Sequence, residues 1–135
     1  MDRKIAVTAV FAAALALLGA AAAFGGGQRS EDVAVTLREF KIVQPATLPA
    51  GPTTFMFQNK GKFEHNYTVV YRSAGATKIA TKGIKPGASA TLDVNLKPGT
   101  YTVLCTIFNG YHASQGMEKQ FTVGKIDFKT GTWGA

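Results

Sequence analysis

The strongest constraint on the fold is a series of short segments in which apolar and polar residues alternate. In segment 33–43, Val33, Val35 and Leu37 alternate with other residues at the period of a half-buried strand. Similar segments follow at 53–61, 65–72, 88–96, 100–106 and 118–125. Turns rich in glycine and proline separate them, and no segment has a convincing helical period. The pattern predicts an all-β protein, an antiparallel sandwich or Greek-key barrel.

The remaining segments are expected to connect these strands. Segment 44–53 is rich in proline and predicts a turn, and segment 73–87 is expected to be mostly loop. A long loop should join Cys105 to Met117. With 135 residues and 46% apolar content, the chain can bury one core, so we expect one domain at residues 33–125 and a C-terminal tail at 126–135.

The N-terminus is not part of that domain. Residues 1–23 combine a basic start, an apolar run and small residues, as in an export signal peptide. No charge follows Lys4 until Arg29, so a retained membrane anchor, which needs about 20 apolar residues, is the alternative. Residues 24–32 then form a flexible linker. Both interpretations place the folded domain outside the cytoplasm, in the periplasm or the extracellular space.

The charge balance of the chain is basic. The formal net charge is +7, and removing residues 1–23, which carry +1, leaves +6. A basic exported domain favours acidic partners or anionic surfaces through long-range steering. The lysines are scattered, without a basic run or interleaved aromatic residues, so nucleic acid is not an expected partner.

The chain has a single cysteine, Cys105, and the stretch CTIFNGYHASQGM that begins there also holds His112 and Met117. A buried cysteine at the end of a strand is the simplest interpretation. An unpaired thiol in an oxidising compartment is nevertheless a liability unless it is hidden or bound. No motif supports a nucleophile. A thiolate, a thioether and two imidazoles select copper, and this is the ligand set of blue-copper electron-transfer sites.

Two segments resemble those of the cupredoxins. FEHNYTVVY resembles their first-ligand segment, and GTYTVLCTIFNGYHASQGMEKQFTV resembles their last hairpin, which supplies a cysteine, a histidine and a methionine. The resemblance covers residues 33–125 and implies a small plastocyanin-like or sulfocyanin-like cupredoxin. It implies one copper ion per chain, as Cu(I) or Cu(II). His65, Cys105 and His112 would then be equatorial ligands and Met117 the axial ligand.

The resemblance also implies residues around the ligands. Asn66 would tie the His65 loop to the backbone next to Cys105, with Thr106 as its neighbour in this outer layer. One feature departs from the family pattern. Six residues, TIFNGY, separate Cys105 from His112, and this interval is shorter in the commonest members. We therefore expect an enlarged loop in front of His112.

The implied function is outer-sphere transfer of one electron between exported or membrane redox proteins, such as cytochromes or a membrane oxidase. The alternative is copper delivery or storage, but the chain has no methionine-rich or histidine-rich cluster. An enzyme is not expected, because four protein ligands leave no open position for a substrate. We expect a monomer in which the outer edge of His112 is the shortest path to solvent. Ile107, Phe108 and Tyr111 either form an apolar docking surface around it or pack the loop.

Overall fold

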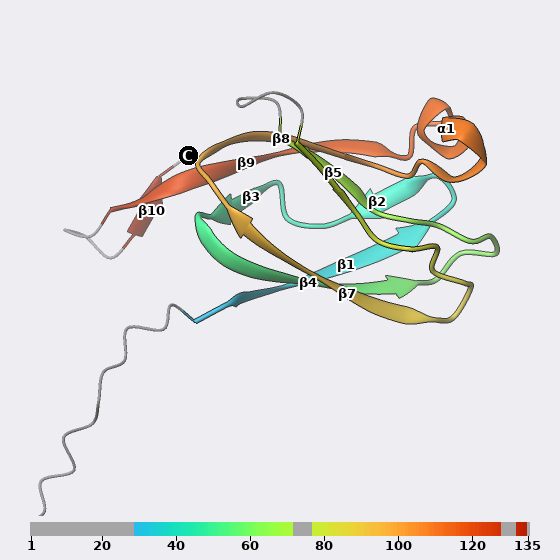
Figure 1. Ribbon diagram of the computed structural model, residues 1–135, viewed down its shortest axis with the longest axis horizontal. Coiled ribbons are helices and arrows are strands. Elements are labelled where there is room, and N and C mark those ends of the chain that lie inside the picture. The colour runs from blue at the N-terminus through green and yellow to red at the C-terminus, as the bar shows by residue number, and fades with distance from the viewer. Residues whose placement is uncertain (1–28, 72–76, 128–131, 135) are drawn as a thin grey trace, which may run out of the picture.

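The computed structural model describes residues 29–71, 77–127 and 132–134, which form two β-sheets packed face to face (Figure 1). The predicted β-sandwich is confirmed. The first sheet has the strand order β2-β1-β4-β7 and comprises β1 (Glu31–Arg38), β2 (Lys41–Val43), β4 (Gly51–Asn59) and β7 (Ser89–Leu96). The second sheet has the order β10-β9-β8-β5-β6, with β3 beside β9. Its strands are β3 (Thr47–Pro49), β5 (Thr68–Tyr71), β6 (Thr77–Ala80), β8 (Gly99–Leu104), β9 (Glu118–Asp127) and β10 (Thr132–Gly134).

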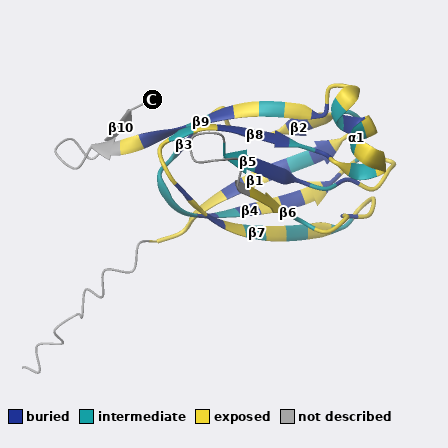
Figure 2. Cartoon of the chain, turned by 45° about the horizontal axis from the view of Figure 1, so that its top comes forward, coloured by how far each residue is buried: buried dark blue, intermediate teal, exposed yellow. Residues whose placement is uncertain are grey.

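The alternating residues of the strands meet between the two sheets. Val33, Val35 and Leu37 of β1 are all buried, as their period predicts, and Phe55 and Phe57 of β4 join them. Figure 2 shows buried residues along β5 and β8, and exposed residues along much of β7 and α1. The apolar period of the sequence therefore decided which face of each strand the core covers.

Several segments differ from the expectations. The predicted strand 33–43 is broken at Glu39 and Phe40 into β1 and β2, which pair as an antiparallel hairpin. Segment 44–53 contains the strand β3, and segment 73–87 contains β6. β1 pairs with β4 and β3 pairs with β9 in parallel, so the sandwich is mixed rather than antiparallel. Parallel pairing of β1 depends on partners distant in sequence, which a local pattern does not reveal.

The segment expected to be a long loop contains a short helix, α1 (Ile107–Ser114). It lies at the end of the sandwich opposite the start of β1 (Figure 1). Phe108, Asn109 and Gly110 have φ values of 53°, 55° and 82°, so the first part of α1 turns in the left-handed region. The last part is held by hydrogen bonds from Gln115 N–H to the carbonyls of Tyr111 and His112. A helix this short and interrupted leaves no helical period in the sequence, so the sequence analysis did not predict α1.

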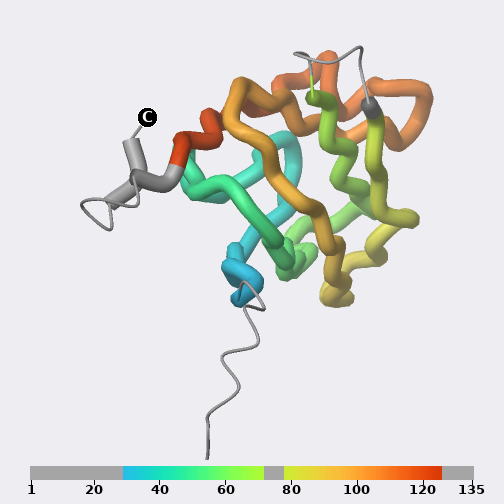
Figure 3. The backbone as a smooth tube through the Cα atoms, turned by 60° about the vertical axis from the view of Figure 1, so that its left-hand side comes forward, coloured from blue at the N-terminus to red at the C-terminus, as the bar shows by residue number. Residues whose placement is uncertain are grey.

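The two ends of the described chain extend beyond the predicted domain of residues 33–125. The predicted signal peptide or anchor at 1–23 and linker residues 24–28 lie outside the described residues. Strand β1 begins at Glu31, within the segment expected to be linker, and β10 in the expected tail pairs with β9. Within the described ranges, no helix has the length and apolar character to span a membrane. The backbone tube in Figure 3 follows the described core from β1 in blue to β9 in red.

Candidate metal centre

Three side chains from distant parts of the sequence meet at one end of the sandwich. His65 Nδ1 lies 3.1 Å from His112 Nδ1, and Cys105 Sγ lies 3.9 Å from the first nitrogen and 3.5 Å from the second. All three side chains are buried, and their ligand atoms lie within 4.8 Å of one another. A metal ion can be held where at least three histidine, cysteine or acidic side chains lie close together. Among the described residues, His65, Cys105 and His112 meet this condition.

Each side chain is delivered by a separate element. His65 precedes β5 and forms a two-way backbone bridge with Ile84, with N–H to carbonyl distances of 3.1 and 2.7 Å. Cys105 directly follows β8, and His112 lies in the last turns of α1. The cluster therefore exists only when both sheets and the helix are assembled.

Met117 directly precedes β9 and is fully buried. Its backbone ties the other two segments together, because its carbonyl accepts the Cys105 N–H at 3.1 Å and its N–H donates to the His112 carbonyl at 3.0 Å. Gly116, with a φ of 104°, makes the turn that brings the chain back to β9. Met117 is thus placed beside Cys105 and His112, while Met56 is exposed on β4.

The spacing of the three atoms fits a first-row metal ion. In a trigonal plane with metal bonds of about 2.0–2.1 Å to nitrogen and about 2.3 Å to sulfur, the nitrogens would be about 3.5 Å apart and about 3.8 Å from the sulfur. The observed separations of 3.1, 3.5 and 3.9 Å are close to these values. One thiol and two imidazoles are soft and borderline donors, a set that suits copper and does not suit calcium or magnesium.

Hydrogen bonds connect the segments that follow His65 and Cys105. Thr106 N–H donates to Asn66 Oδ1 at 2.7 Å, and Asn66 Nδ2 donates to Thr106 Oγ1 at 2.8 Å. The Asn66 N–H points at Cys105 Sγ with a separation of 3.4 Å. The segment after His65 is thereby joined to the segment after Cys105 by three hydrogen bonds.

The protonation states follow from burial. Burial raises the pKa of the Cys105 thiol, and N–H groups of Asn66 and Ile107 act in the opposite direction. Burial lowers the pKa of His65; a hydrogen bond and the charge of Glu39 raise it, and the charge of His112 lowers it. A metal ion that binds here must therefore displace the thiol proton, so binding releases a proton.

Aromatic rings cover the outer side of His112. The centroids of Phe40 and Phe108 lie 5.3 Å from the imidazole, and those of Tyr111 and Phe63 lie at 6.2 and 6.4 Å. His112 itself is only 2% exposed. The exposed groups are instead Phe108 at 64%, Tyr111 at 54% and Phe63 at 54%. We call these three residues the aromatic patch.

Ile107, which was expected beside Phe108 and Tyr111, is partly buried and packs against the hydrophobic core. Phe63 and Phe40 were missed by the sequence analysis. Phe63 lies in the segment that resembles the first-ligand region, but nothing in its spacing marks it as a neighbour of a residue 49 positions later. Their approach to His112 depends on the tertiary fold.

Two polar residues near His65 were also missed. Glu39 Oε1 lies 3.1 Å from His65 Nε2 and accepts the N–H groups of Lys62 and Phe63, both at 2.8 Å. Burial raises the pKa of this carboxyl, but the hydrogen bonds from backbone N–H groups and His65 outweigh it and lower the pKa to about 2. Asn59 is completely buried and bonds three backbone groups around the His65 loop. No sequence signal identifies either residue.

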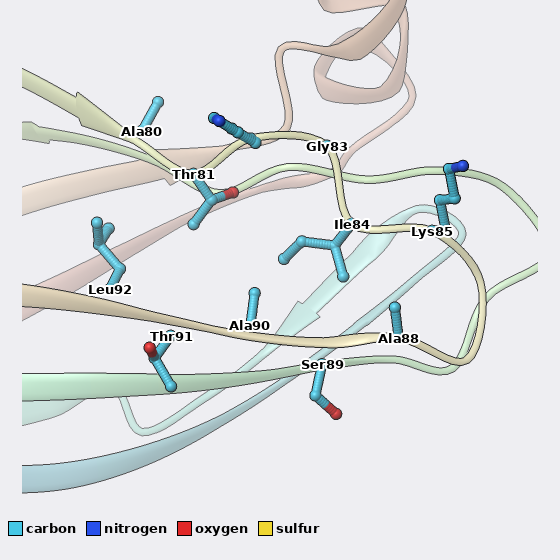
Figure 4. A pocket seen from close by; sticks show the side chains of 11 residues that line it. Ala80, Thr81, Gly83, Ile84, Lys85, Ala88, Ser89, Ala90, Thr91 and Leu92 are labelled. Carbon is cyan, nitrogen blue, oxygen red and sulfur yellow. The ribbon is translucent and has the colours of Figure 1, made fainter.

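A separate surface groove lies between the 81–85 loop and β7 (Figure 4). Small side chains such as Ala80, Ala88 and Ala90 line it, and Ile84 points into it. None of its lining residues is a histidine, cysteine or acidic residue. The candidate chemistry is therefore concentrated at the buried cluster and not in this groove.

Comparison with known proteins identifies the fold. No protein-family model and no curated protein matches the sequence. Among solved structures, reduced auracyanin from Roseiflexus castenholzii is similar at 24% identity and a TM-score of 0.57, covering 71% of this chain and 98% of its own. Auracyanin B is similar at 18% identity and a TM-score of 0.58, with 71% and 90% covered. Rusticyanin from Thiobacillus ferrooxidans is similar at 16% identity and 0.54, with 71% and 79% covered.

The architecture is therefore that of a cupredoxin, a β-sandwich with its candidate metal cluster at one end. The His65, Cys105 and His112 cluster fits a blue-copper site in donor type and in spacing.

Proposed function

We propose that the protein is a type 1 copper electron carrier that passes one electron by outer-sphere transfer between exported or membrane redox partners. The observation that carries this proposal is the buried triangle formed by two imidazole nitrogens and the only thiol of the chain, with edges of 3.1, 3.5 and 3.9 Å. Copper would supply the one-electron redox couple and would be held by His65, Cys105, His112 and Met117.

The surrounding structure suits a carrier because it restrains the ligands. Backbone hydrogen bonds join Cys105 to Met117 and Met117 to His112, and Asn66 joins the His65 segment to Thr106. Ligands restrained in this way change position little when the metal changes its charge. A small change in geometry is what permits fast electron transfer in both directions.

The same restraint disfavours the alternative, copper delivery or storage. All three cluster residues are buried, and a delivered metal ion must be released on demand. Met117 is also buried, and Met56 is the exposed methionine of the described chain. Four protein ligands would leave no open position for a substrate, so we propose a carrier and not an enzyme.

The aromatic patch is the proposed exit for the electron and the docking surface. Phe108 contacts His112 ring to ring and is 64% exposed, so it links the buried cluster to the surface. The left-handed backbone at Phe108 costs about 1 kcal/mol for a residue other than glycine. Such strain at an exposed ring is consistent with selection for docking rather than for loop packing.

Lysines near the His65 loop favour an acidic partner. Lys60 and Lys62 are exposed in the loop before His65, and Lys82 and Lys85 are exposed on either side of Ile84, which bridges to His65. An apolar patch beside these cations would suit a cytochrome or membrane oxidase with an acidic docking surface, approached by a monomer of this protein. The export signal or anchor proposed at residues 1–23 would place the carrier beside such partners.

A visible and EPR spectrum of the copper-loaded protein tests the proposal. An intense thiolate-to-Cu(II) band is expected in the wild type and should be absent from Cys105→Ser, because a hydroxyl is a poor soft ligand. Zinc-loaded wild type is the control, since a d¹⁰ ion without redox chemistry gives no such colour. Retention of the band in Cys105→Ser would exclude Cys105 as the ligand.

A second measurement separates a carrier from a delivery protein. Cyclic voltammetry should show a reversible one-electron wave. The reduced protein should also retain its copper when a Cu(I) chelator is added, and the loss of copper should be slower than electron self-exchange. Prompt loss of Cu(I) to the chelator with no reversible wave would favour delivery.

A further inference from the structure

The two nitrogens of His65 face different partners. Nδ1 faces the cluster, 3.1 Å from His112 Nδ1 and 3.9 Å from Cys105 Sγ. Nε2 faces away from it and meets Glu39 Oε1 at 3.1 Å. A carboxylate can only accept this hydrogen bond, so Nε2 carries the proton and Nδ1 has a free lone pair. The 3.1 Å contact between the imidazoles then requires His112 Nδ1 to be the donor in the metal-free protein.

The carboxylate itself is held in place from its other side. Glu39 lies in the turn between β1 and β2, and its Oε1 also accepts the backbone N–H groups of Lys62 and Phe63, each at 2.8 Å. Three donors therefore converge on one carboxylate oxygen. The side chain is 22% exposed and His65 is 0% exposed, so the charge sits at the boundary between the cluster and solvent.

Gly61 leaves the space that this contact needs. A Cβ atom at position 61 would lie 2.5 Å from Glu39 Oε1, 2.9 Å from Oε2 and 2.9 Å from His65 Nε2. Any side chain there would push against both members of the pair. The Gly61 N–H donates to Asn59 Oδ1 at 2.8 Å, which keeps the glycine over the contact. The turn that contains Glu39 and the loop that contains Gly61 thus both accommodate the contact between Glu39 and His65.

We propose that Glu39 is a positioning residue of the copper centre, which holds His65 as the Nε2-protonated tautomer with Nδ1 as the ligand atom and favours Cu(II) through its negative charge. The proposal rests on the proposed function, since it assigns a role toward copper. A carboxylate bonded to the outer nitrogen of a ligand histidine orients the ring and makes it a stronger donor. An anion near the centre also stabilises the higher metal charge, because the Coulomb energy is larger in a partly buried site than in water.

Two substitutions separate the roles of shape and charge. Glu39→Gln keeps a carbonyl oxygen that can accept from His65 Nε2 and from the loop, but removes the charge. Glu39→Ala removes both. Glu64→Gln is the matched control, because Glu64 is the exposed neighbour of His65 in sequence and carries the same charge. All variants are made in the full chain and compared at one neutral pH.

The first readout needs no copper. Long-range ¹H–¹⁵N NMR of the metal-free protein reports which imidazole nitrogen carries the proton. We expect the Nε2-protonated tautomer of His65 in the wild type, in Glu39→Gln and in Glu64→Gln, and a mixture of tautomers in Glu39→Ala. An unchanged single tautomer in Glu39→Ala would overturn the positioning role, because the ring would then be oriented without Glu39.

The second readout is the reduction potential of the copper-loaded protein. Glu39→Gln should raise it, shifting the Cu(I) to Cu(II) ratio at a given potential by roughly tenfold, which is about 59 mV for one electron. Glu64→Gln should shift it much less, since solvent screens an exposed charge. Equal shifts of the reduction potential in Glu39→Gln and Glu64→Gln would show that any nearby negative charge has this effect. That result would overturn the tuning role of Glu39.

The outcomes also distinguish this proposal from the proposed function. If the wild type forms no coloured copper centre, the proposed function fails, and the tautomer of the metal-free protein alone decides whether Glu39 positions His65. If the wild type is coloured but Glu39→Ala changes neither the His65 tautomer nor the reduction potential, the proposed function stands. Glu39 then only stabilises the loop through its hydrogen bonds with Lys62 and Phe63. Gly61→Ala should reproduce part of the tautomer mixture, because its Cβ displaces the carboxylate.

Discussion

Asn59 should be one of the largest single contributors to stability at the metal end of the fold. It is 0% exposed, and its amide makes three hydrogen bonds to backbone groups. Nδ2 donates to the carbonyls of Phe63 and Ile84, and Oδ1 accepts the Gly61 N–H, each at 2.8 Å. Gly61 and Phe63 lie in the loop before His65, and Ile84 forms the backbone bridge with His65. Asn59→Ala would leave all three without that partner, which costs about 1 kcal/mol for each bond and about 3 kcal/mol in total.

Urea unfolding of the metal-free protein measures this loss without depending on copper. In a domain of this size, about 3 kcal/mol corresponds to a fall in Tm of about 12–24 °C. Asn95→Ala, on the exposed face of β7, is the control and should change the free energy of unfolding by less than about 0.5 kcal/mol. Amide exchange at Gly61 should accelerate in Asn59→Ala only. A loss below about 1 kcal/mol would refute the reasoning, because water or neighbouring groups would then replace the amide.

Three further outcomes are expected. Met117→Gln should keep copper and lower the reduction potential by about 59 mV or more, a tenfold change in the redox equilibrium, while Met56→Gln leaves it unchanged; an unaltered potential in the first variant removes Met117 from the centre. Phe108→Lys should slow electron self-exchange at least about tenfold with an unchanged spectrum, and added salt should restore only part of the rate; equal rates at low and high salt would return Phe108 to loop packing. Burial raises the pKa of Tyr67, so the unfolded chain loses this proton first and stability falls above about pH 10, by up to about 1.4 kcal/mol per pH unit. Tyr67→Phe should lower the free energy of unfolding by about 1–2 kcal/mol at neutral pH, because Gln44 Oε1 loses its 2.6 Å donor. In urea titrations its free energy of unfolding should then fall less steeply above about pH 10 than that of the wild type. Parallel declines in the two proteins would contradict this assignment.

The sequence predicted the part of the fold that depends on local period. Alternation in β1, for example, placed Val33, Val35 and Leu37 in the core, because a strand side chain changes face at every residue. It did not predict the break at Glu39, the parallel pairing of β1 with β4, or the helix α1. These features depend on contacts between distant segments or on backbone conformations that few residue types announce.

The candidate cluster divides in the same way. The residue types of Cys105, His112 and Met117 and their spacing in one stretch, with His65 in a second, sufficed to select them from the sequence, because copper ligands are chemically distinctive and few were available. Only the tertiary structure decided what surrounds them. Phe40 and Phe63 cover His112, and Glu39 reaches His65 from another turn. Carboxylates and phenylalanines are common, and each of these three residues lies far in sequence from the histidine that it contacts. Their roles therefore arise only when the chain is folded.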